Sequence, residues 1–147
     1  MSAVVVFVPG KPAPQGSKSY KGHRGGVPIL AESSKAVAPW RADIREHLLA
    51  RHTGAQLLGP LRVDLAFVMP RPTSAPKRST PPAIKRPDLD KLARAVLDAV
   101  GSAGVWHDDS QVVQLHASKR IAEIGEPSGV AITIGEIEPP TTAKELA

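Results

Sequence analysis

The segment from Arg86 to Val113 carries the most constraining pattern in this chain, an amphipathic helix with a pair of aspartates at each end. Pro87 suits the first turn of this helix and Asp88 suits its N-cap, while Gly101 and Gly104 predict where it ends. The expected buried face, with apolar residues at helical spacing, consists of Leu89, Leu92, Ala93, Val96, Leu97 and Val100. The two acidic pairs therefore lie at the two ends of one amphipathic helix.

The acidic pairs are candidates for a metal site. Residues two apart within a helix point about 200° away from each other, so Asp88 and Asp90 converge only if Asp88 sits at the cap. Two carboxylates at the positive end of a helix favour their ionised form and provide half of a site for a hard divalent cation. The other half is expected from Asp108 or Asp109, just before an apolar run that predicts a strand. Because adjacent strand residues face opposite ways, we expect one of that pair to reach the site.

A purely structural reading of the same acids is also open. Aspartate is common at helix N-caps and in first turns, and an Asp-Asp pair after Trp-His is compatible with a turn. Under this reading the carboxylates are solvated and bind no metal.

Composition restricts the class of protein. The length of 147 residues predicts one domain. The sequence contains no apolar run of ~18 residues, so we expect no membrane partner, and its start lacks the features of a signal peptide. Cysteine is absent, which is consistent with a reducing cytoplasm. Aromatic residues make up 3% of the chain, which leaves little material for a base-stacking platform.

Charge is distributed unevenly along the chain. The net charge is +5, but residues 1–87 hold 14 Lys and Arg against 4 Asp and Glu, whereas residues 88–147 hold 5 against 10. A basic first part joined to an acidic second part suits a polyanionic substrate, whose phosphates bind the cations while metal ions mask the carboxylates. Ordinary charge scatter on a soluble protein is the alternative.

The expected fold is α+β, a single compact domain over residues 1–136 followed by a disordered tail at 137–147. We predict a small mixed or antiparallel sheet of four to five strands with two main helices on one face. The strands are predicted at 3–8, 28–31, 61–69, 111–117 and 129–134. The first helix is predicted from a cap at Ser33 or Ser34 to about His52, with Val37, Trp40, Ile44, Leu48 and Leu49 on its buried face.

Two basic loops, at 10–28 and 70–87, are candidates for DNA contact. The first includes a Gly- and Lys-rich stretch at 14–27, which we interpret as an arm that orders on binding or as a solvated loop. The second is rich in proline, and a long loop within a compact domain is usually functional. The cations expected to contact phosphates are Lys18, Lys21, Arg24, Lys77, Arg78, Lys85, Arg86 and Lys91.

The stretch RPDLDKLARAVLDAVGSAGVWHDDSQVV closely resembles the catalytic segment of the RusA family of Holliday junction resolvases, common in phages and prophages. The stretches VPGKPAPQGSKSY and ESSKAVAPWR are also similar to members of this family, so the resemblance covers most of residues 4–135. It implies that the essential, metal-binding acids are Asp88, Asp90 and Asp109. Two positions depart from the family pattern, because Lys91 replaces an Asn and Arg94 replaces a functional Lys. Arg94 retains the charge for a phosphate contact but does not give up a proton.

The resemblance implies a homodimeric, Mg²⁺-dependent endodeoxyribonuclease, with Mn²⁺ as a substitute. Such an enzyme resolves four-way DNA junctions by paired symmetric nicks during recombination or repair, in the cytoplasm of a bacterium or a phage-infected cell. Asp88, Asp90, Asp109 and Arg94 would be its catalytic residues. Three alternatives stay open at this stage: a catalytically inactive junction-binding protein of the same fold, a nuclease for other branched DNA, and an interaction module with a solvated acidic cluster.

Overall fold

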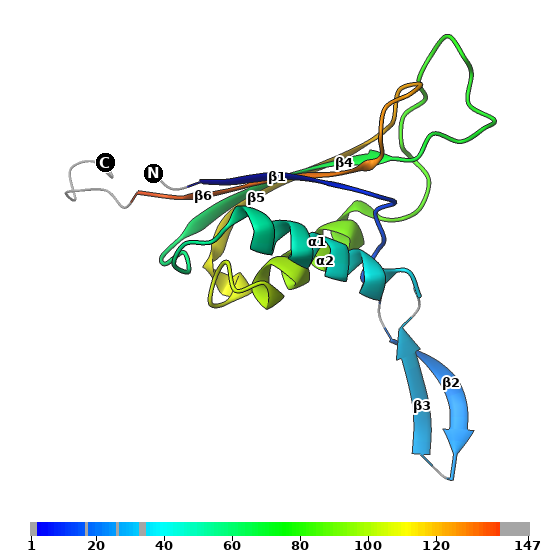
Figure 1. Ribbon diagram of the computed structural model, residues 1–147. Coiled ribbons are helices and arrows are strands. Elements are labelled where there is room, and N and C mark those ends of the chain that lie inside the picture. The colour runs from blue at the N-terminus through cyan, green and yellow to red at the C-terminus, as the bar shows by residue number, and fades with distance from the viewer. Residues whose placement is uncertain (1–2, 17, 26, 33–34, 139–147) are drawn as a thin grey trace, which may run out of the picture.

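The chain folds into a four-stranded sheet with two helices on one face and a separate two-stranded hairpin (Figure 1). This computed structural model describes residues 3–16, 18–25, 27–32 and 35–138, with side chains except at 18–24 and 27–32. The strands are β1 (Ala3–Pro9), β2 (Lys18–Arg24), β3 (Val27–Glu32), β4 (Leu61–Met69), β5 (Val112–Ile121) and β6 (Gly129–Glu136). The helices are α1 (Val37–Arg51), α2 (Leu89–Ser102) and the short 3₁₀ helix η1 (Asp109–Gln111).

The sheet has the strand order β1-β6-β4-β5. The pairs β1–β6 and β6–β4 are antiparallel, whereas β4 and β5 are parallel. A parallel pair needs a long crossover, and residues 70–87 together with α2 provide it. The alternation of apolar and polar residues in β1 and β4 places one face of each strand in the core. The prediction was a mixed or antiparallel sheet of four to five strands, and the observed sheet is a mixed one of four strands, since the strand predicted at 28–31 pairs outside it.

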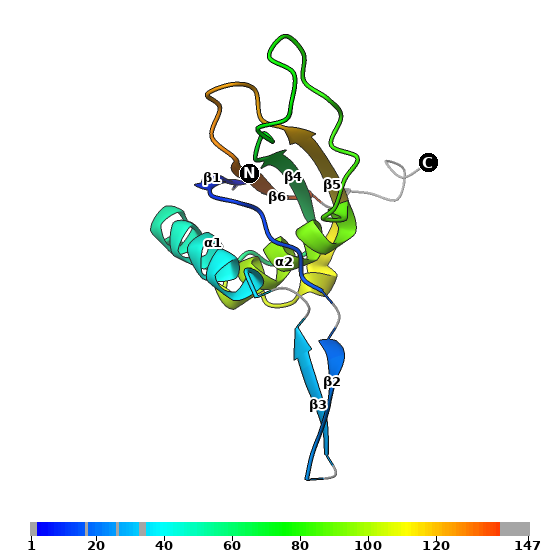
Figure 2. The same cartoon turned by 90° about the vertical axis from the view of Figure 1, so that its right-hand side faces the viewer.

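The core lies between this sheet and the two helices (Figures 1 and 2). From α1 it receives Val37, Trp40, Ile44 and Leu48, and from α2 it receives Leu92, Ala93, Ala95, Val96, Ala99 and Val100. The helical spacing in the sequence predicted both faces, apart from the two alanines Ala95 and Ala99. Leu89 and Leu97 are only partly buried, at the margin of the core.

The start of the first helix and one residue of its face were predicted wrongly. Helix α1 begins at Val37, and its N-cap residue is Ala36, which offers no side-chain hydrogen bond. Ser33 and Ser34 lie outside the described residues. The side chain of Leu49 is 44% exposed because it follows Leu48 by 100° around the helix and turns away from the sheet.

The stretch 14–27 is not the continuous loop that we predicted. Most of it pairs as β2 with β3 in an antiparallel hairpin, which extends away from the sheet and helices in both views (Figures 1 and 2). Gly25, with a φ of 59°, supplies the left-handed backbone of the turn. The backbones of β2 and β3 therefore hydrogen-bond to each other within the hairpin. The predicted strand at 28–31 is confirmed as part of β3, while the side chains of Lys18, Lys21 and Arg24 are outside the described set.

The boundaries around α2 also differ from prediction. Asp88 is the N-cap, as expected, but its side chain makes no capping bond, and Pro87 lies before the cap rather than in the first turn. Gly101 lies inside the helix, which ends at Ser102. The first stretch of the crossover, residues 70–87, contains no helix or strand, as predicted. No helix within the described ranges is both long and apolar enough to cross a membrane.

Candidate active site

Two acidic side chains stand at the N-terminal end of α2. Asp88 has extended backbone angles (φ −71°, ψ 141°), and Asp90 follows in the first helical turn. Both are exposed, and the ammonium Nζ of Lys91 lies 3.9 Å from Oδ2 of Asp88. An exposed pair at this distance contributes little to stability, so Lys91 leaves the carboxylate accessible to another cation. The prediction that Asp88 is the N-cap and that Asp90 lies at the same helix end is confirmed.

Lys119 of β5 fixes the segment that leads into Asp88. Its ammonium Nζ donates hydrogen bonds of 2.8 Å to the carbonyl oxygens of both Lys85 and Pro87. Two charge-assisted bonds to neighbouring carbonyls hold the backbone immediately before the N-cap. Sequence reasoning missed Lys119, which is separated from Asp88 by the whole of α2. The apolar register of β5 was the available signal, because it places Lys119 on the same face as Ala117 and Ile121, which pack on the core.

Asp109 stands at the opposite end of α2. Its Oδ1 accepts a hydrogen bond of 2.8 Å from the indole Nε1 of Trp106, whose side chain is 1% exposed. A Cβ added at Gly101 would lie 3.1 Å from the same oxygen and 3.4 Å from the indole nitrogen. Asp109 is therefore oriented by a buried ring and by the last turn of α2, while it remains exposed to solvent.

Asp108 has a structural role at the start of η1. We predicted that the two aspartates alternate along a strand, and this is wrong. Asp108 is instead the N-cap of η1, and Asp109 is the first residue of that helix. Hydrogen bonds to the carboxylate of Asp108 from the side chain of Ser110 and, at 2.9 Å, from the backbone nitrogen of the same residue lower the pKa of Asp108. Gln111 completes the capping box, so β5 begins at Val112 rather than at Gln111.

The structure does not bring the three predicted ligands together within one chain. Asp88 is the N-cap of α2 and Asp90 lies in its first turn, whereas Asp109 lies beside Gly101 near the other end of the helix. At 1.5 Å per residue, these two ends of α2 are roughly 20 Å apart, beyond the reach of carboxylate side chains that share an ion. Within the described part of the chain, no three acidic or histidine side chains gather closely enough to hold a metal ion. Within one chain, the three predicted ligands therefore do not form a complete metal site.

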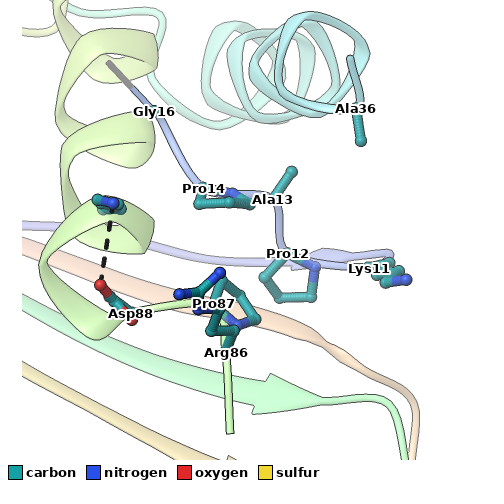
Figure 3. Close-up of a pocket in the computed structure, with 10 residues that line it drawn as sticks. Lys11, Pro12, Ala13, Pro14, Gly16, Ala36, Arg86, Pro87 and Asp88 are labelled. Carbon is teal, nitrogen blue, oxygen red and sulfur yellow. Dashed lines mark ion pairs between the residues drawn. The ribbon is translucent and has the colours of Figure 1, made fainter. Parts of the chain in front are cut away.

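A cavity of about 590 Å³ opens beside Asp88 (Figure 3). The segment after β1 forms one wall, and the segment leading into α2 forms the other. The residues that line it are Lys11, Pro12, Ala13, Pro14, Gly16, Ala36, Arg86, Pro87, Asp88 and Lys91. Among the predicted DNA contacts, Arg86 and Lys91 thus meet at the cavity, and they are joined there by Lys11, which the sequence analysis did not single out.

Three of the other predicted phosphate contacts lie along residues 70–87. Lys77, Arg78 and Lys85 are exposed, and the first two line a second, open depression together with Arg71. The guanidinium of Arg71 donates to the carbonyl oxygens of Ser79 (2.7 Å) and Ala122 (3.1 Å), and also to that of Pro76. Arg71 therefore anchors this basic loop to the end of β5. Arg94, one turn beyond Asp90, is exposed on the outer side of α2.

A comparison with protein-family models decides the family. The model described as endodeoxyribonuclease RusA matches residues 9–135 of the 147-residue chain. The chain belongs to the RusA family. A search of curated proteins found no significant match. RusA membership makes the chain an endodeoxyribonuclease and implies activity on Holliday junctions, so its DNA partner is branched DNA.

The donor atoms at both ends of α2 are of the kind that a hard divalent cation binds. Asp88 and Asp90 present exposed carboxylates, and Asp109 has a second oxygen besides the one bonded to Trp106. Oxygen ligands of this kind suit a hard cation such as Mg²⁺. The arrangement provides two partial ligand sets per chain, one at each end of the helix.

Proposed function

We propose that this RusA-family protein is a homodimeric, Mg²⁺-dependent resolvase that cuts Holliday junctions by paired symmetric nicks. The observation that carries the proposal is the position of Asp88 and Asp90 at one end of α2 and of Asp109 at the other. Each chain holds two incomplete halves of an acidic site that cannot close on each other. A second copy supplies the missing half.

Two-fold symmetry allows a single type of contact between two chains to complete both sites. In an isologous dimer, a contact from residue i to residue j is repeated from j to i. If α2 lies antiparallel to its counterpart, the end that carries Asp88 and Asp90 meets Asp109 of the partner subunit, and the reciprocal contact creates a second, identical site. Two sites related by a two-fold axis match the symmetry of a four-way junction, in which two opposed strands must be cut.

Each side chain has a defined role in this site. Asp88 and Asp90 of one chain, with Asp109 of the partner subunit, would hold Mg²⁺, which lowers the pKa of bound water and stabilises charge on the leaving oxygen. Arg94 would contact a phosphate oxygen near the cut. Lys119 keeps Asp88 in place through the carbonyl of Pro87, and Trp106 orients Asp109.

The first experiment compares cleavage of a synthetic four-way junction with cleavage of linear duplex, with and without Mg²⁺, at moderate salt. We expect paired nicks on the junction that need Mg²⁺ or Mn²⁺ and disappear in Asp90→Asn. Tight junction binding without nicks from either protein would indicate a catalytically inactive binder. Equal cleavage of flaps and forks at the same salt would indicate a nuclease for other branched DNA, since non-specific phosphate affinity is salt-dependent.

Mixed variants test the shared site directly. Asp90→Asn and Asp109→Asn are each expected to be inactive, but their mixed dimer would contain one intact site and one site with both substitutions. We therefore expect mixing after denaturation and refolding to restore single nicks. Mixing Asp88→Asn with Asp90→Asn is the matched control, which restores nothing because both changes affect the same half. Recovery in neither mixture would contradict the shared site, while paired nicks from wild type would still support the resolvase activity.

A further inference from the structure

The cavity beside Asp88 combines an apolar floor with a basic rim, and a metal site needs neither of them. Its floor is apolar, with Pro12 buried and Ala13 only 3% exposed, and Pro14 and Pro87 add two further rings (Figure 3). Its rim carries three cations, from Lys11, Arg86 and Lys91. A simple phosphate contact needs the cations alone, so the apolar floor indicates an occupant that also has an apolar face.

The walls are fixed by hydrogen bonds from several parts of the chain. The backbone nitrogen of Gln15 donates to the carbonyl oxygen of Lys91 (3.0 Å), which ties the segment after β1 to α2. The side chain of Arg41 donates to Oε1 of Gln15. Before the cavity, the nitrogen of Gly10 donates to the carbonyl of Ser128 at 3.0 Å, and the Ser128 hydroxyl donates to the carbonyl of Gly10 at 2.8 Å. The cavity is therefore built in advance of any ligand.

Size and charge together select the occupant. A volume of about 590 Å³ falls within the range of roughly 300–1,000 Å³ that is usual for pockets of small ligands. A double helix does not enter such a space, but one nucleotide does. Its base has an apolar face that packs on apolar side chains, and its phosphates are anions that Lys and Arg neutralise.

We propose that this cavity holds one unstacked nucleotide of the DNA strand next to the cut. This inference rests on the proposed function for its location, because Asp88 forms part of the cavity wall. The base lies on the proline floor, while Lys11 and Arg86 contact the flanking phosphates. Bases at the exchange point of a branched DNA lose stacking neighbours and are displaced at a lower cost than bases within a duplex. The cavity thus favours branched over linear DNA and places the adjacent phosphate beside Asp88.

The test uses a 5′-phosphorylated trinucleotide with 2-aminopurine in the middle, whose fluorescence reports the environment of the base. Titrations of the full chain in EDTA require neither metal nor cleavage. Ala36→Phe fills the cavity from an exposed position, and Lys11→Gln removes a cation from the rim. The matched controls are Ala42→Phe and Lys35→Gln, exposed positions that do not line the cavity.

We expect saturable binding by wild type that weakens about tenfold in Ala36→Phe and in Lys11→Gln, the equivalent of one lost stacking or charged contact. Both controls should stay within about twofold of wild type, as the general scatter of surface substitutions allows. On a junction, Ala36→Phe should also slow cleavage, and an abasic site next to the cut should restore the rate. Unchanged trinucleotide binding by both cavity variants would overturn the inference even if the junction is cleaved normally. Cavity-dependent binding by a protein that cuts no junction would support the inference and contradict the resolvase activity.

Discussion

The indole Nε1 of Trp106 donates a hydrogen bond of 2.8 Å to Oδ1 of Asp109, from a ring that is almost completely buried. The carboxylate is exposed, yet one of its two oxygens is fixed by the core. This contact links the packing of the domain to the orientation of a proposed metal ligand. A Cβ at residue 101 would lie 3.1 Å from the same oxygen, so a larger residue there would have to displace the carboxylate by a few tenths of an ångström.

Replacement of Trp106 by Phe tests this link. Phe retains much of the buried apolar surface but cannot donate to Asp109, so the carboxylate loses its fixed orientation. We expect junction cleavage under single-turnover conditions to slow about tenfold, in line with the loss of one hydrogen bond to a charged group. Junction affinity in Ca²⁺ should be unchanged. A variant that stays folded by circular dichroism and cleaves at the wild-type rate would show that the indole bond has no role in catalysis.

Lys119 is the corresponding support at the other end of α2. Lys119→Met keeps the aliphatic part of the side chain and removes the donor to the carbonyls of Lys85 and Pro87. We expect faster amide hydrogen exchange in residues 84–90 and a cleavage rate lowered at least tenfold, because even one lost hydrogen bond from a charged group is worth roughly 1.5–3 kcal/mol. Gln114→Leu, on the opposite face of the same strand, is the control and should alter neither measurement. Unchanged exchange in Lys119→Met would contradict the positioning role.

Local patterns were sufficient to predict most of the fold. Alternation in Leu61–Met69 predicted β4 with its observed bounds, and helical spacing from Leu89 to Val100 predicted the buried face of α2. The spacing of apolar residues in these patterns matches the spacing of the side chains that face the core, so it indicates both the element and its buried face. The sequence analysis did not predict the hairpin of β2 and β3, because the β2 sequence KSYKGHR has no alternating apolar residues. The pairing of the two strands depends on backbone hydrogen bonds, which produce no pattern in the sequence.

The candidate site was predictable in its residue types but not in its geometry. Asp88 and Asp90 were placed at one helix end from the cap and the angle per residue, which are local quantities. The position of Asp109 depends on the path of the chain after Ser102, where Gly104, with a φ of 76°, and η1 keep the chain at the C-terminal end of α2. That path is a tertiary property, as are the contacts of Lys119.

Glu126 provides a prediction about acid stability. Its carboxylate accepts two hydrogen bonds of 2.6 Å from Arg120 and one of 2.9 Å from the backbone nitrogen of Glu123, and these bonds lower its pKa from 4.5 to about 2. A carboxyl group whose pKa is lower in the folded state stabilises the fold above its unfolded pKa and loses this effect as the pH falls. We therefore expect the difference in Tm between wild type and Glu126→Gln to be largest near neutral pH and to shrink between about pH 4.5 and pH 2.

Arg120→Gln serves as the partner variant in this series. It removes the first cause of the pKa shift, so its Tm should follow the same pH dependence as that of Glu126→Gln. The double variant should lose little more than either single variant, as expected for two residues that act as a pair. A pH-independent Tm difference between wild type and Glu126→Gln would contradict the assignment of this ion pair as a source of acid sensitivity.

The basic loop at 70–87 predicts a salt dependence for DNA binding. Lys77 and Arg78 are exposed near its tip, while Arg71 holds the loop through the carbonyls of Ser79 and Ala122. If both exposed cations contact phosphates, the double variant Lys77→Gln/Arg78→Gln should reduce the slope of log K against log salt by about 2, one for each lost contact. Arg62→Gln is the control, because that guanidinium already pairs with Asp64 at 3.1 Å. Junction affinities measured across a salt series should separate the two outcomes. A double variant with the wild-type slope would mean that this loop stays clear of the DNA, and the phosphate contacts would then have to come from Lys85, Arg86 and the cavity rim.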